Sequence, residues 1–211
     1  MASLSPQEFV QQILVRVLQS RLVVVGEDFR FGHRRAGDIG LLTSLGEQHG
    51  FQTEAVSEVV EGGLKVSSSR VRQALADGDL GLVRRLLGRP YTLSGRVRYG
   101  QQLGRKLGFP TLNLAMPDDL VAIGIFAVRV HGLSREPLPG VASLGRRPTV
   151  ESNGRLLLEV HVLDWDGLAY GQAVQVEMVE RLRGEKTFDH LDAMIEQMHQ
   201  DLAQARQRLQ P

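Results

Sequence analysis

Residues 104–114 read Gly104-Arg105-Lys106-Leu107-Gly108-Phe109-Pro110-Thr111-Leu112-Asn113-Leu114, a basic loop that leads into a strand. Pro110 restricts Phe109 to an extended conformation, so the strand begins at this point. Residues two apart in a strand share a face. We therefore expect Thr111 and Asn113 to lie side by side on one face, with two leucines on the other.

Further short strands are expected on both sides of this stretch. Apolar alternation broken by turn residues predicts strands at about 91–98, 111–114, 124–131, 140–146, 155–164 and 172–181. Because none of the intervening segments has helical periodicity, these strands favour a closed antiparallel barrel. A C-terminal helix of about twenty residues follows, and its apolar stripe predicts packing against the barrel. The stripe consists of Leu191, Met194, Ile195, Met198, Leu202 and Ala205.

The first half of the chain follows a different, α/β pattern. The expected elements are a helix capped by Ser5 and Glu8 that runs to Gln19, a buried strand at 22–25, a helix at 38–48, a strand at 51–59, and short helices at 68–77 and 79–87. The two short helices end at Gly78 and Gly88. We place the boundary between an α/β domain (1–88) and a barrel domain (89–211) near Gly88–Pro90.

The composition restricts the classes of function. The 211 residues carry a net charge of +1, which argues against nucleic acid or an anionic membrane as a partner. The absence of cysteine excludes disulfides, iron–sulfur clusters and thiol nucleophiles, and the six histidines are too scattered for a transition-metal site. Neither a secretory signal nor an apolar run of about 20 residues occurs, so we expect a cytoplasmic protein.

Glycines and cationic residues are concentrated before the strand at 111–114. Residues 94–117 lack acidic side chains and include Gly95, Gly100, Gly104, Gly108, Arg96, Arg98, Arg105 and Lys106. Glycine lets backbone N–H groups turn toward a polyanion, and guanidinium groups add charge-assisted hydrogen bonds. The composition is consistent with a flap over a phosphate, and also with a solvated hairpin loop. No P-loop motif is present.

Two strands carry polar side chains suited to phosphoryl transfer. The Thr111 hydroxyl and the Asn113 amide oxygen are hard donors for a magnesium ion, or else the polar outer face of an ordinary strand. The apolar face of the strand at 155–164 consists of Leu156, Leu158, Val160 and Val162. Glu159 lies on the opposite face, where a carboxylate can act as general base toward an alcohol or can simply be solvated.

Seven motifs follow one another along the second half of the chain. They are Gly95-x-Val97, residues 104–114, Gly124-Ile125-Phe126-Ala127, Ser143-Leu144-Gly145 with Pro148-Thr149, Glu159-x-His161-x-Leu163-Asp164, Leu168-x-Tyr170-Gly171 and Arg181-Leu182-Arg183-x-Glu185-x-x-Phe188. Through these motifs, in this order, the chain resembles bacterial riboflavin kinases over essentially all of 89–211. The resemblance implies a six-stranded antiparallel β-barrel with a C-terminal helix.

The same resemblance implies roles for individual residues. Thr111 and Asn113 match ligands of the magnesium ion that accompanies ATP, and Glu159 matches the catalytic base. The residues expected to bind ATP are Gly95, Arg98, Gly104, Arg105, Lys106, Gly108, Phe109, Pro110 and Thr111. Those expected near the flavin are Arg183, Glu185 and Phe126.

The chain departs from the family pattern at two places. Leu112 stands where the family more often has alanine, but the strand pattern turns this side chain away from the expected metal. Gly145-Arg146-Arg147-Pro148-Thr149 replaces the usual Gly-Thr-Asn-Pro-Thr in a loop that borders the flavin pocket of the family. The second change bears on the affinity for the flavin.

The first half contains Val25-Gly26-Glu27-Asp28-Phe29-Arg30-Phe31-Gly32, then Arg35-Ala36-Gly37-Asp38, and later Val66-Ser67-Ser68-Ser69-Arg70-Val71-Arg72. Through these motifs it resembles the adenylyltransferase domain that is fused to bacterial riboflavin kinases, a Rossmann-like nucleotidyltransferase. The residues expected to form a remnant of its nucleotide site are Gly26, Asp28, Phe29, Phe31, Gly32, Ser68, Ser69, Arg70 and Arg72. A hydroxyl-rich helix N-terminus binds phosphate, although a serine-capped surface helix has the same sequence. Because the family's His-x-Gly-His element is absent, we expect a domain without its N-terminal part, little or no FMN adenylylation, and self-association through an exposed sheet.

These features together predict a riboflavin kinase that converts riboflavin and ATP to FMN and ADP with Mg²⁺. One alternative is a non-catalytic fragment that binds flavin or nucleotide, which the Arg146-Arg147 substitution keeps open. Another is a nucleic-acid-binding barrel that uses the arginines of 96–105. The low aromatic content of 5% argues against it, because single-strand binders need stacking platforms.

Overall fold

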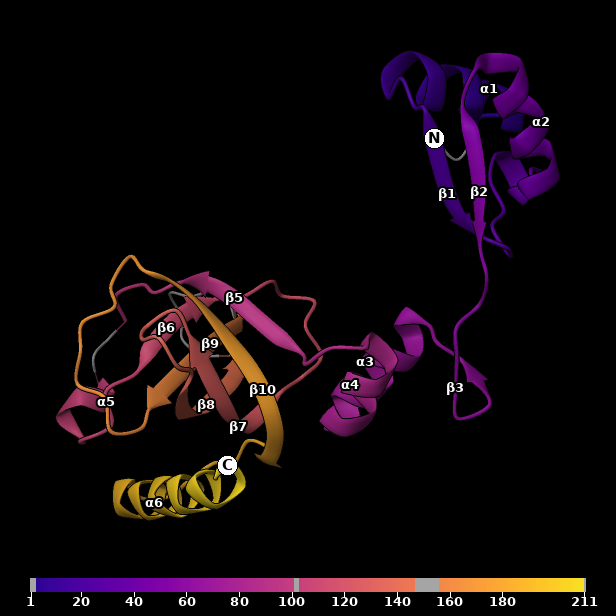
Figure 1. Cartoon of the computed structure of the whole chain (residues 1–211). Coiled ribbons are helices and arrows are strands. Elements are labelled where there is room, and N and C mark those ends of the chain that lie inside the picture. Colours follow the sequence, from indigo (N-terminus) through magenta and orange to yellow (C-terminus); the bar gives the residue numbers. More distant parts are fainter. Residues whose placement is uncertain (1–2, 101–102, 147–155, 211) are drawn as a thin grey trace. The chain divides into compact units, whose positions relative to one another are not determined.

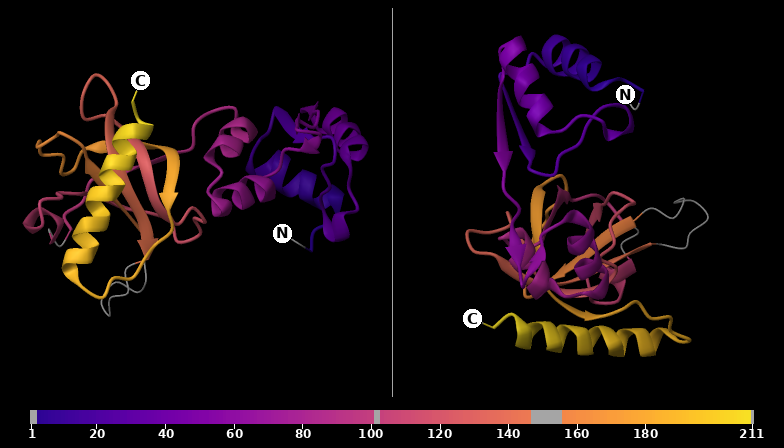
Figure 2. Two further views of the ribbon diagram at one scale, coloured as in Figure 1. Left: turned by 90° about the horizontal axis from the view of Figure 1, so that it is seen from below. Right: turned by 90° about the vertical axis from the view of Figure 1, so that its right-hand side faces the viewer.

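The structure is a computed structural model that describes residues 3–100, 103–146 and 156–210. The chain forms two compact units, Met1–Val66 and Ser67–Pro211, which are described separately below. Figure 1 labels their helices and strands, and Figure 2 shows the same ribbon from two further sides.

The first unit is a small α/β structure. Its elements are the helix α1 (Pro6–Phe9), which continues as a π-helix (Val10–Val17), β1 (Leu22–Gly26), a 3-10 turn (His33–Arg35), α2 (Ile39–His49), β2 (Gln52–Val56) and the hairpin of β3 (Val60–Glu61) and β4 (Leu64–Lys65). The predicted capping box is confirmed, because Ser5 Oγ accepts from the Glu8 amide while Glu8 accepts from the Ser5 amide. The hairpin was not predicted.

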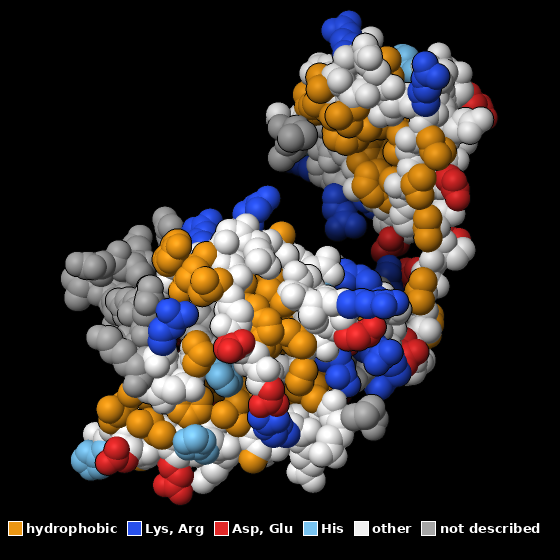
Figure 3. All heavy atoms as spheres, turned by 60° about the vertical axis from the view of Figure 1, so that its left-hand side comes forward, with side chains coloured by type: hydrophobic (Ala, Val, Ile, Leu, Met, Phe, Trp, Pro, Cys, Tyr) orange, Lys and Arg blue, Asp and Glu red, His pale blue; other side chains and the backbone are white. Residues whose placement is uncertain are grey.

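The sheet of the first unit is buried on one side. β1 and β2 pair in parallel, and Val23 and Val25 pack against a helical core that includes Leu14 and Leu42. The prediction that this strand is buried on both faces is wrong, since Leu22 and Val24 are each 51% exposed. Among the described residues no third strand or second helical layer covers that face. Figure 3 shows hydrophobic side chains gathered on the surface of this unit.

Two helices open the second unit. They are α3 (Ser68–Asp77) and α4 (Leu80–Leu87), and both end as predicted at glycines with positive φ, Gly78 at 79° and Gly88 at 68°. The Arg181 guanidinium of the barrel donates to the Ala76 carbonyl at 3.2 Å, so these helices pack with the barrel. The compact units therefore divide at residues 66 and 67. The division into functional domains at 88 and 89 stays a prediction.

The rest of the second unit is the predicted antiparallel barrel. Its elements are β5 (Thr92–Arg96), a short helix α5 (Leu103–Lys106), β6 (Leu112–Ala115), β7 (Gly124–His131), β8 (Leu138–Arg146), β9 (Leu156–Val162), β10 (Ala173–Arg183) and α6 (Leu191–Arg208). The strand order is β5-β10-β7-β8-β9-β6, with antiparallel pairing throughout. The Arg98 amide donates to the Asn113 carbonyl at 2.8 Å, which nearly closes the sheet between its two end strands.

The barrel interior and its outer wall are separated by the alternation of β9. Leu156, Leu158, Val160 and Val162 are buried in the interior, as predicted, whereas Glu159 and His161 are half-buried on the other face. The helix α6 lies along that outer side, across β7, β8 and β10 (Figure 2). Its C-terminal half is packed on the sheet through Ala205, Leu209 and Ala127. No helix of the described residues has the length and apolarity to cross a membrane.

Candidate active site

A cavity of about 420 Å³ is lined by α6 and by the outward faces of the sheet. The loop before β6 contributes Gly104 and Phe109, and the strands contribute Thr111, Asn113, Ile125, Ser143 and Glu159. The end of β10 and the following loop add Arg183, Glu185 and Phe188, and α6 adds Met194, Met198, Asp201 and Leu202. Segments from most of the barrel thus meet in one hollow.

The register of the sheet brings the three candidate phosphoryl-transfer residues together. Asn113 of β6 is paired with Glu159 of β9, and residues opposite each other in an antiparallel pair lie about 4.5–5.5 Å apart at Cα. Thr111 precedes β6 and lines the same cavity. The two leucines of β6 are buried on the interior side, as the strand pattern predicted.

The polar groups of this end fit a magnesium ion. Asn113 is only 7% exposed, and its Nδ2 donates to the Thr111 carbonyl at 3.2 Å. Its Oδ1 is buried and has no hydrogen-bond partner among the described residues. A buried acceptor without a donor is costly, and a hard cation would satisfy it. The described residues contain no cluster of three or more histidine, cysteine or acidic side chains that could hold a metal ion.

Two histidines from neighbouring elements contact the segment that precedes β6. His161 Nδ1 hydrogen-bonds the Pro110 carbonyl at 2.8 Å, one residue before Thr111. The Phe109 ring is 4% exposed and meets the rings of His161 and His199 edge-on, with centroids 5.7 and 5.0 Å apart. His161 was noted in a sequence motif but not as a site residue, and His199 was missed.

The opposite end of the cavity contains a buried ion pair. Arg183 Nε donates to Asp201 at 2.9 and 3.1 Å, and its Nη2 donates at 2.7 Å. Asp201 is 3% exposed and also accepts from Gln197 Nε2 at 3.0 Å. Sequence reasoning missed Asp201. Its spacing was a usable signal, because Asp201 follows Met194 by seven residues and so falls within the apolar stripe of α6.

The apolar stripe of α6 contributes both to the packing against the sheet and to the wall of the cavity. Ala205 packs on the sheet as predicted, whereas Met194, Met198 and Leu202 line the cavity. Leu191, which was expected in the packed stripe, is 54% exposed because it lies at the first helical residue, beyond the sheet contacts. The helix is therefore both core and cavity wall.

The flavin candidates are not all in the cavity. Arg183 and Glu185 line it, but Phe126 is completely buried and is not among the described lining residues. Ile125, one position earlier in β7, lines the cavity in its place. Successive strand residues point to opposite faces, so Phe126 is directed to the barrel interior.

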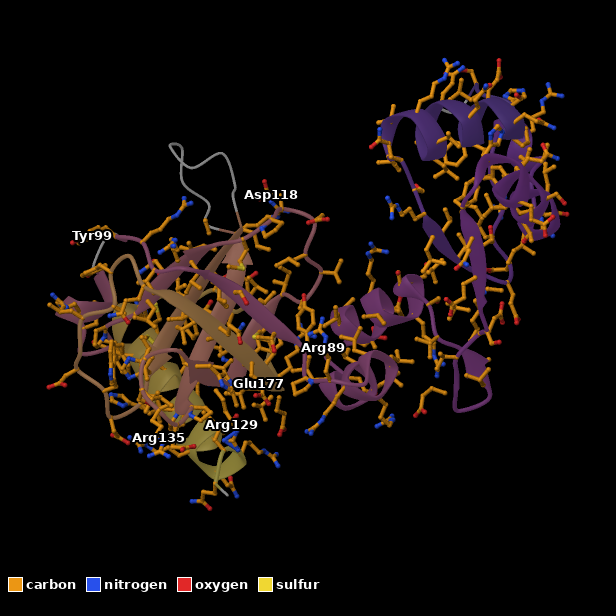
Figure 4. All side chains as sticks on the ribbon, turned by 45° about the horizontal axis from the view of Figure 1, so that its top comes forward. Arg89, Tyr99, Asp118, Arg129, Arg135 and Glu177 are labelled. Carbon is orange, nitrogen blue, oxygen red and sulfur yellow. The ribbon has the colours of Figure 1, made fainter. Side chains whose placement is uncertain are left out.

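Three of the candidate ATP residues, Arg105, Pro110 and Thr111, line a second, smaller cavity of about 200 Å³. Trp165 and Tyr170 also line it, and Thr111 lines both cavities. Tyr170 is stacked on Tyr99, with ring centroids 3.9 Å apart. Figure 4 labels Tyr99. Because Thr111 lines both, the two cavities are adjacent at this residue.

The other flap residues take three kinds of position. Gly104 lines the first cavity, and a Cβ there would collide with the Phe109 carbonyl, so only glycine fits. Gly95 lies in β5 over the Leu114 side chain, Arg98 is exposed beside the sheet closure, and Gly108 is exposed in the turn after α5. The side chain of Lys106 and residues 147–149 lie outside the described residues.

The expected remnant of a second nucleotide site is divided between the two units. Gly26, Asp28, Phe29, Phe31 and Gly32 belong to the first unit, and Ser68, Ser69, Arg70 and Arg72 belong to the second. Phe31 is a core residue that is stacked on Phe29 at 5.6 Å. Asp28 is paired with Lys65 at 2.6 Å, and the hydrogen bond from that ammonium lowers the pKa of the carboxyl. Whether the two groups converge stays a prediction.

The start of α3 differs slightly from the expected phosphate site. The helix is capped by Ser67, whose hydroxyl accepts from the Arg70 amide at 3.2 Å. Ser68 and Ser69 are exposed in the first turn, and Arg72 is exposed one turn on. The hydroxyl-rich helix start is therefore present, and its binding of phosphate stays a prediction.

Comparisons with known proteins cover almost the whole chain. A family model described as riboflavin kinase matches residues 87–209, and one described as FAD synthetase matches residues 1–70. The bifunctional riboflavin kinase/FMN adenylyltransferase of Escherichia coli (strain K12) is 44% identical over 207 residues, which is 98% of this chain and 66% of the relative. The enzyme of the same name from Pseudomonas fluorescens is 43% identical over 205 residues.

A solved structure agrees with the fold. A crystal structure of a protein from Streptococcus pneumoniae, described as a macrolide-efflux protein, superposes with a TM-score of 0.74 at 30% identity. It covers 97% of this chain and 66% of its own. The chain thus spans about two thirds of the length of the curated relatives it matches, with 66% covered in the first two.

Proposed function

The chain belongs to the riboflavin kinase family, and from that premise we propose that it transfers the γ-phosphate of ATP to the 5′-hydroxyl of riboflavin, giving FMN and ADP. The observation that carries the proposal is the cavity lined by both Glu159 and Asn113 at one end and by Arg183 at the other. Its volume of about 420 Å³ lies within the usual range for small-molecule sites.

The two ends of the cavity differ in chemistry, which orients the substrate. Met194, Met198 and Leu202 form an apolar wall suited to a flat aromatic ring, and methionine sulfur contacts ring edges favourably. Thr111, Asn113 and Glu159 gather hard oxygen atoms at the other end. We place the isoalloxazine ring against α6, with the ribityl chain directed toward Glu159.

Glu159 is the general base in this proposal. Its carboxylate accepts the hydrogen bond of the 5′-hydroxyl and takes the proton as the alcohol oxygen forms its bond to the γ-phosphorus. The bond between that phosphorus and the β,γ-bridging oxygen breaks, and ADP leaves. Thr111 and Asn113 would hold Mg²⁺, which neutralises phosphate charge when bound. Positioning of the groups supplies most of the rate enhancement in such transfers.

The nucleotide is assigned to the second cavity because it shares Thr111 with the first. Trp165 and Tyr170 offer aromatic surfaces to a base, and Arg105 offers a guanidinium to the phosphates. A triphosphate that spans the two hollows would bring its γ-phosphate to Thr111. Donor and acceptor would then approach from opposite sides, as an in-line transfer requires.

The finer proposal for the first half is that this chain makes FMN but not FAD. The sequence has no His-x-Gly-His element to stabilise a transferring adenylyl group. Asp28, a candidate of the second nucleotide site, is engaged by Lys65. Both observations support loss of FMN adenylylation.

We also propose that the chain self-associates through its first unit. Leu22, Val24 and Val56 expose 51%, 51% and 48% of their surface on strands of a two-stranded sheet. Apolar surface and unpaired strand edges of this kind favour contact between copies. Sedimentation at rising concentration tests this, and Leu22→Lys with Val24→Lys should return the chain to monomers.

One assay tests the enzymatic proposal. The purified chain is given riboflavin, ATP and Mg²⁺, and the flavin products are separated by chromatography. We expect FMN, with its formation abolished in Glu159→Gln and Thr111→Ala. Flavin binding without FMN would favour a non-catalytic binding fragment, and FAD among the products would contradict the proposal for the first half.

A further inference from the structure

We propose that Asp201 is a positioning residue for flavin binding, which acts by fixing the Arg183 guanidinium at the α6 end of the cavity. This proposal rests on the proposed kinase function and deepens it. Asp201 and Arg183 both line the cavity, although they come from α6 and from the last residue of β10. Their ion pair joins the helix to the sheet at the place where we put the flavin ring.

The hydrogen bonds of Arg183 determine which of its N–H groups can bind a ligand. Asp201 accepts from Nε and Nη2, and the Gly184 carbonyl accepts from Nη1 at 2.9 Å. A guanidinium has five N–H groups. These bonds use one on each nitrogen, so one N–H of Nη1 and one of Nη2 remain for a ligand. Because Asp201 accepts from both Nε and Nη2, the other N–H of Nη2 lies on the distal edge of the planar group, where it suits a carbonyl oxygen.

The surroundings keep this geometry rigid. The Arg183 side chain is 16% exposed and that of Asp201 is 4% exposed, so water competes little for the bonds. Gln197 donates to Asp201 at 3.0 Å and in turn accepts from Lys186 at 3.1 Å. The Phe188 ring lies 5.9 Å from the guanidinium carbon. A buried carboxylate that Gln197 supports therefore holds the arginine in one orientation.

Charge balance decides which part of the ligand fits this end. Asp201 neutralises Arg183, and the remaining charged side chains here, Glu185 and Lys186, are exposed and of opposite sign. The end carries no net charge, so it disfavours a phosphate and suits a neutral ring with carbonyl acceptors. Removal of the Asp201 charge would leave a mobile cation in its place.

Four variants of the full chain test the proposal: Asp201→Asn, Asp201→Glu, Arg183→Gln and the double change of Asp201→Asn with Arg183→Gln. Riboflavin affinity is measured by flavin fluorescence, beside kcat and the KM of each substrate. Loss of a buried charge partner predicts a rise of roughly tenfold or more in the riboflavin Kd and KM for Asp201→Asn. We expect kcat and the KM for ATP to change less than about threefold, and Asp201→Glu to recover part of the affinity.

The double variant separates positioning from a structural role. If Asp201 acts through Arg183, the Asp201→Asn change should add little once Arg183 is glutamine. Additive losses, or equal loss of kcat and of both KM values, would overturn the proposal. Asp192→Asn, an exposed acid on the same helix, is the matched control and should leave every constant unchanged.

The remaining outcomes are also decisive. If Asp201→Asn does not fold, Gln197→Met removes one support of the carboxylate and should raise the riboflavin Kd by a smaller factor, and an unchanged Kd would count against the proposal. Wild-type chain that makes no FMN refutes the kinase proposal. Wild-type activity with an unaltered Asp201→Asn variant refutes this one alone.

Discussion

The barrel and the first unit both carry motifs of nucleotide enzymes, but the motif residues of the barrel line one cavity and those of the first unit have other structural contacts. In the barrel, Thr111, Asn113, Glu159 and Arg183 are separated by up to 72 residues in sequence and line one cavity. In the first unit, Phe31 is in the core and Asp28 is tied to Lys65. Among the described residues, the sheet of β1 and β2 has two strands, whereas the barrel sheet has six.

The difference shows what brings scattered motifs together. Antiparallel pairing of β6 with β9 fixes Asn113 opposite Glu159, and pairing of β8 with β9 adds Ser143. Each further strand supplies another side chain to the same outer face. Among the described residues of the first unit, β1 pairs only with β2, so the register places fewer side chains beside one another. Whether its motifs converge with those of the second unit stays a prediction.

The largest effect is expected for Glu159→Gln. The substitution keeps the shape and removes the base, so FMN formation should fall roughly 100-fold or more, as for other general bases. Riboflavin affinity and the unfolding temperature should change little. Measurement of FMN by chromatography, beside a flavin titration, distinguishes loss of chemistry from loss of binding.

Glu177→Gln is the control for that change. Glu177 is on β10 (Figure 4), where it is paired with His131 at 3.1 Å and is not among the described cavity residues. We expect it to retain FMN formation within about twofold, because general-base losses are specific to the base. Equal losses in both variants would mean that Glu159 supports the sheet rather than the reaction.

Asn113→Leu should separate activity from stability. The leucine removes a buried Oδ1 that has no partner among the described residues, which offsets loss of the bond to the Thr111 carbonyl. Stability in urea should stay within about 1 kcal/mol of wild type or rise. FMN formation should fall roughly 100-fold, with an increased Mg²⁺ requirement. A large loss of stability would show that the amide is mainly structural.

The sequence predicted the strands and faces of the barrel well, and for a physical reason. Alternation in 155–164 reports which side is buried, so the face of Glu159 followed from its apolar neighbours. Sequence did not predict Asp201, because the partner that accounts for its burial, Arg183, is 18 residues away and the contact forms only when α6 docks. Phe126 faces the barrel interior, because a motif identifies only a segment and the pleat determines which of its residues faces the cavity. Its role near the flavin stays a prediction.

His161→Leu tests whether activity requires the hydrogen bond that holds the segment before β6, which includes Pro110 and Thr111. Loss of the 2.8 Å bond to the Pro110 carbonyl should make the position of Thr111 less fixed, and so raise the KM for ATP with Mg²⁺ by roughly tenfold. The loss of this hydrogen bond should also lower the free energy of unfolding by about 1 kcal/mol. Riboflavin affinity should change less. His131→Leu, a histidine of β7 outside the cavity, should leave the KM for ATP unaltered. The same KM shift in both variants would remove the positioning role.

The smallest effect is expected in the first unit, at the Asp28–Lys65 pair. The Lys65 ammonium lowers the pKa of Asp28, so the pair stabilises the fold above the unfolded value of about 3.9 and its contribution is lost as pH falls through the folded pKa. Lys65 has a raised pKa, so its own contribution is lost only as pH rises past about 10.4. Between pH 7 and 3, Asp28→Asn should therefore flatten the acid-induced loss of amide protection in β1 and β2.

Two measurements on one sample of the Asp28→Asn variant separate effects on the first unit from effects on the barrel. Hydrogen exchange follows the first unit, while the only tryptophan, Trp165, reports on the barrel. Asp28→Asn should leave the tryptophan signal and FMN formation at wild-type values, because Asp28 belongs to the other compact unit. Glu47→Gln, an exposed acid on α2, should reproduce the wild-type acid profile. If Asp28→Asn instead lowers FMN formation, the first unit contributes to the kinase reaction, and the contrast between the two units fails.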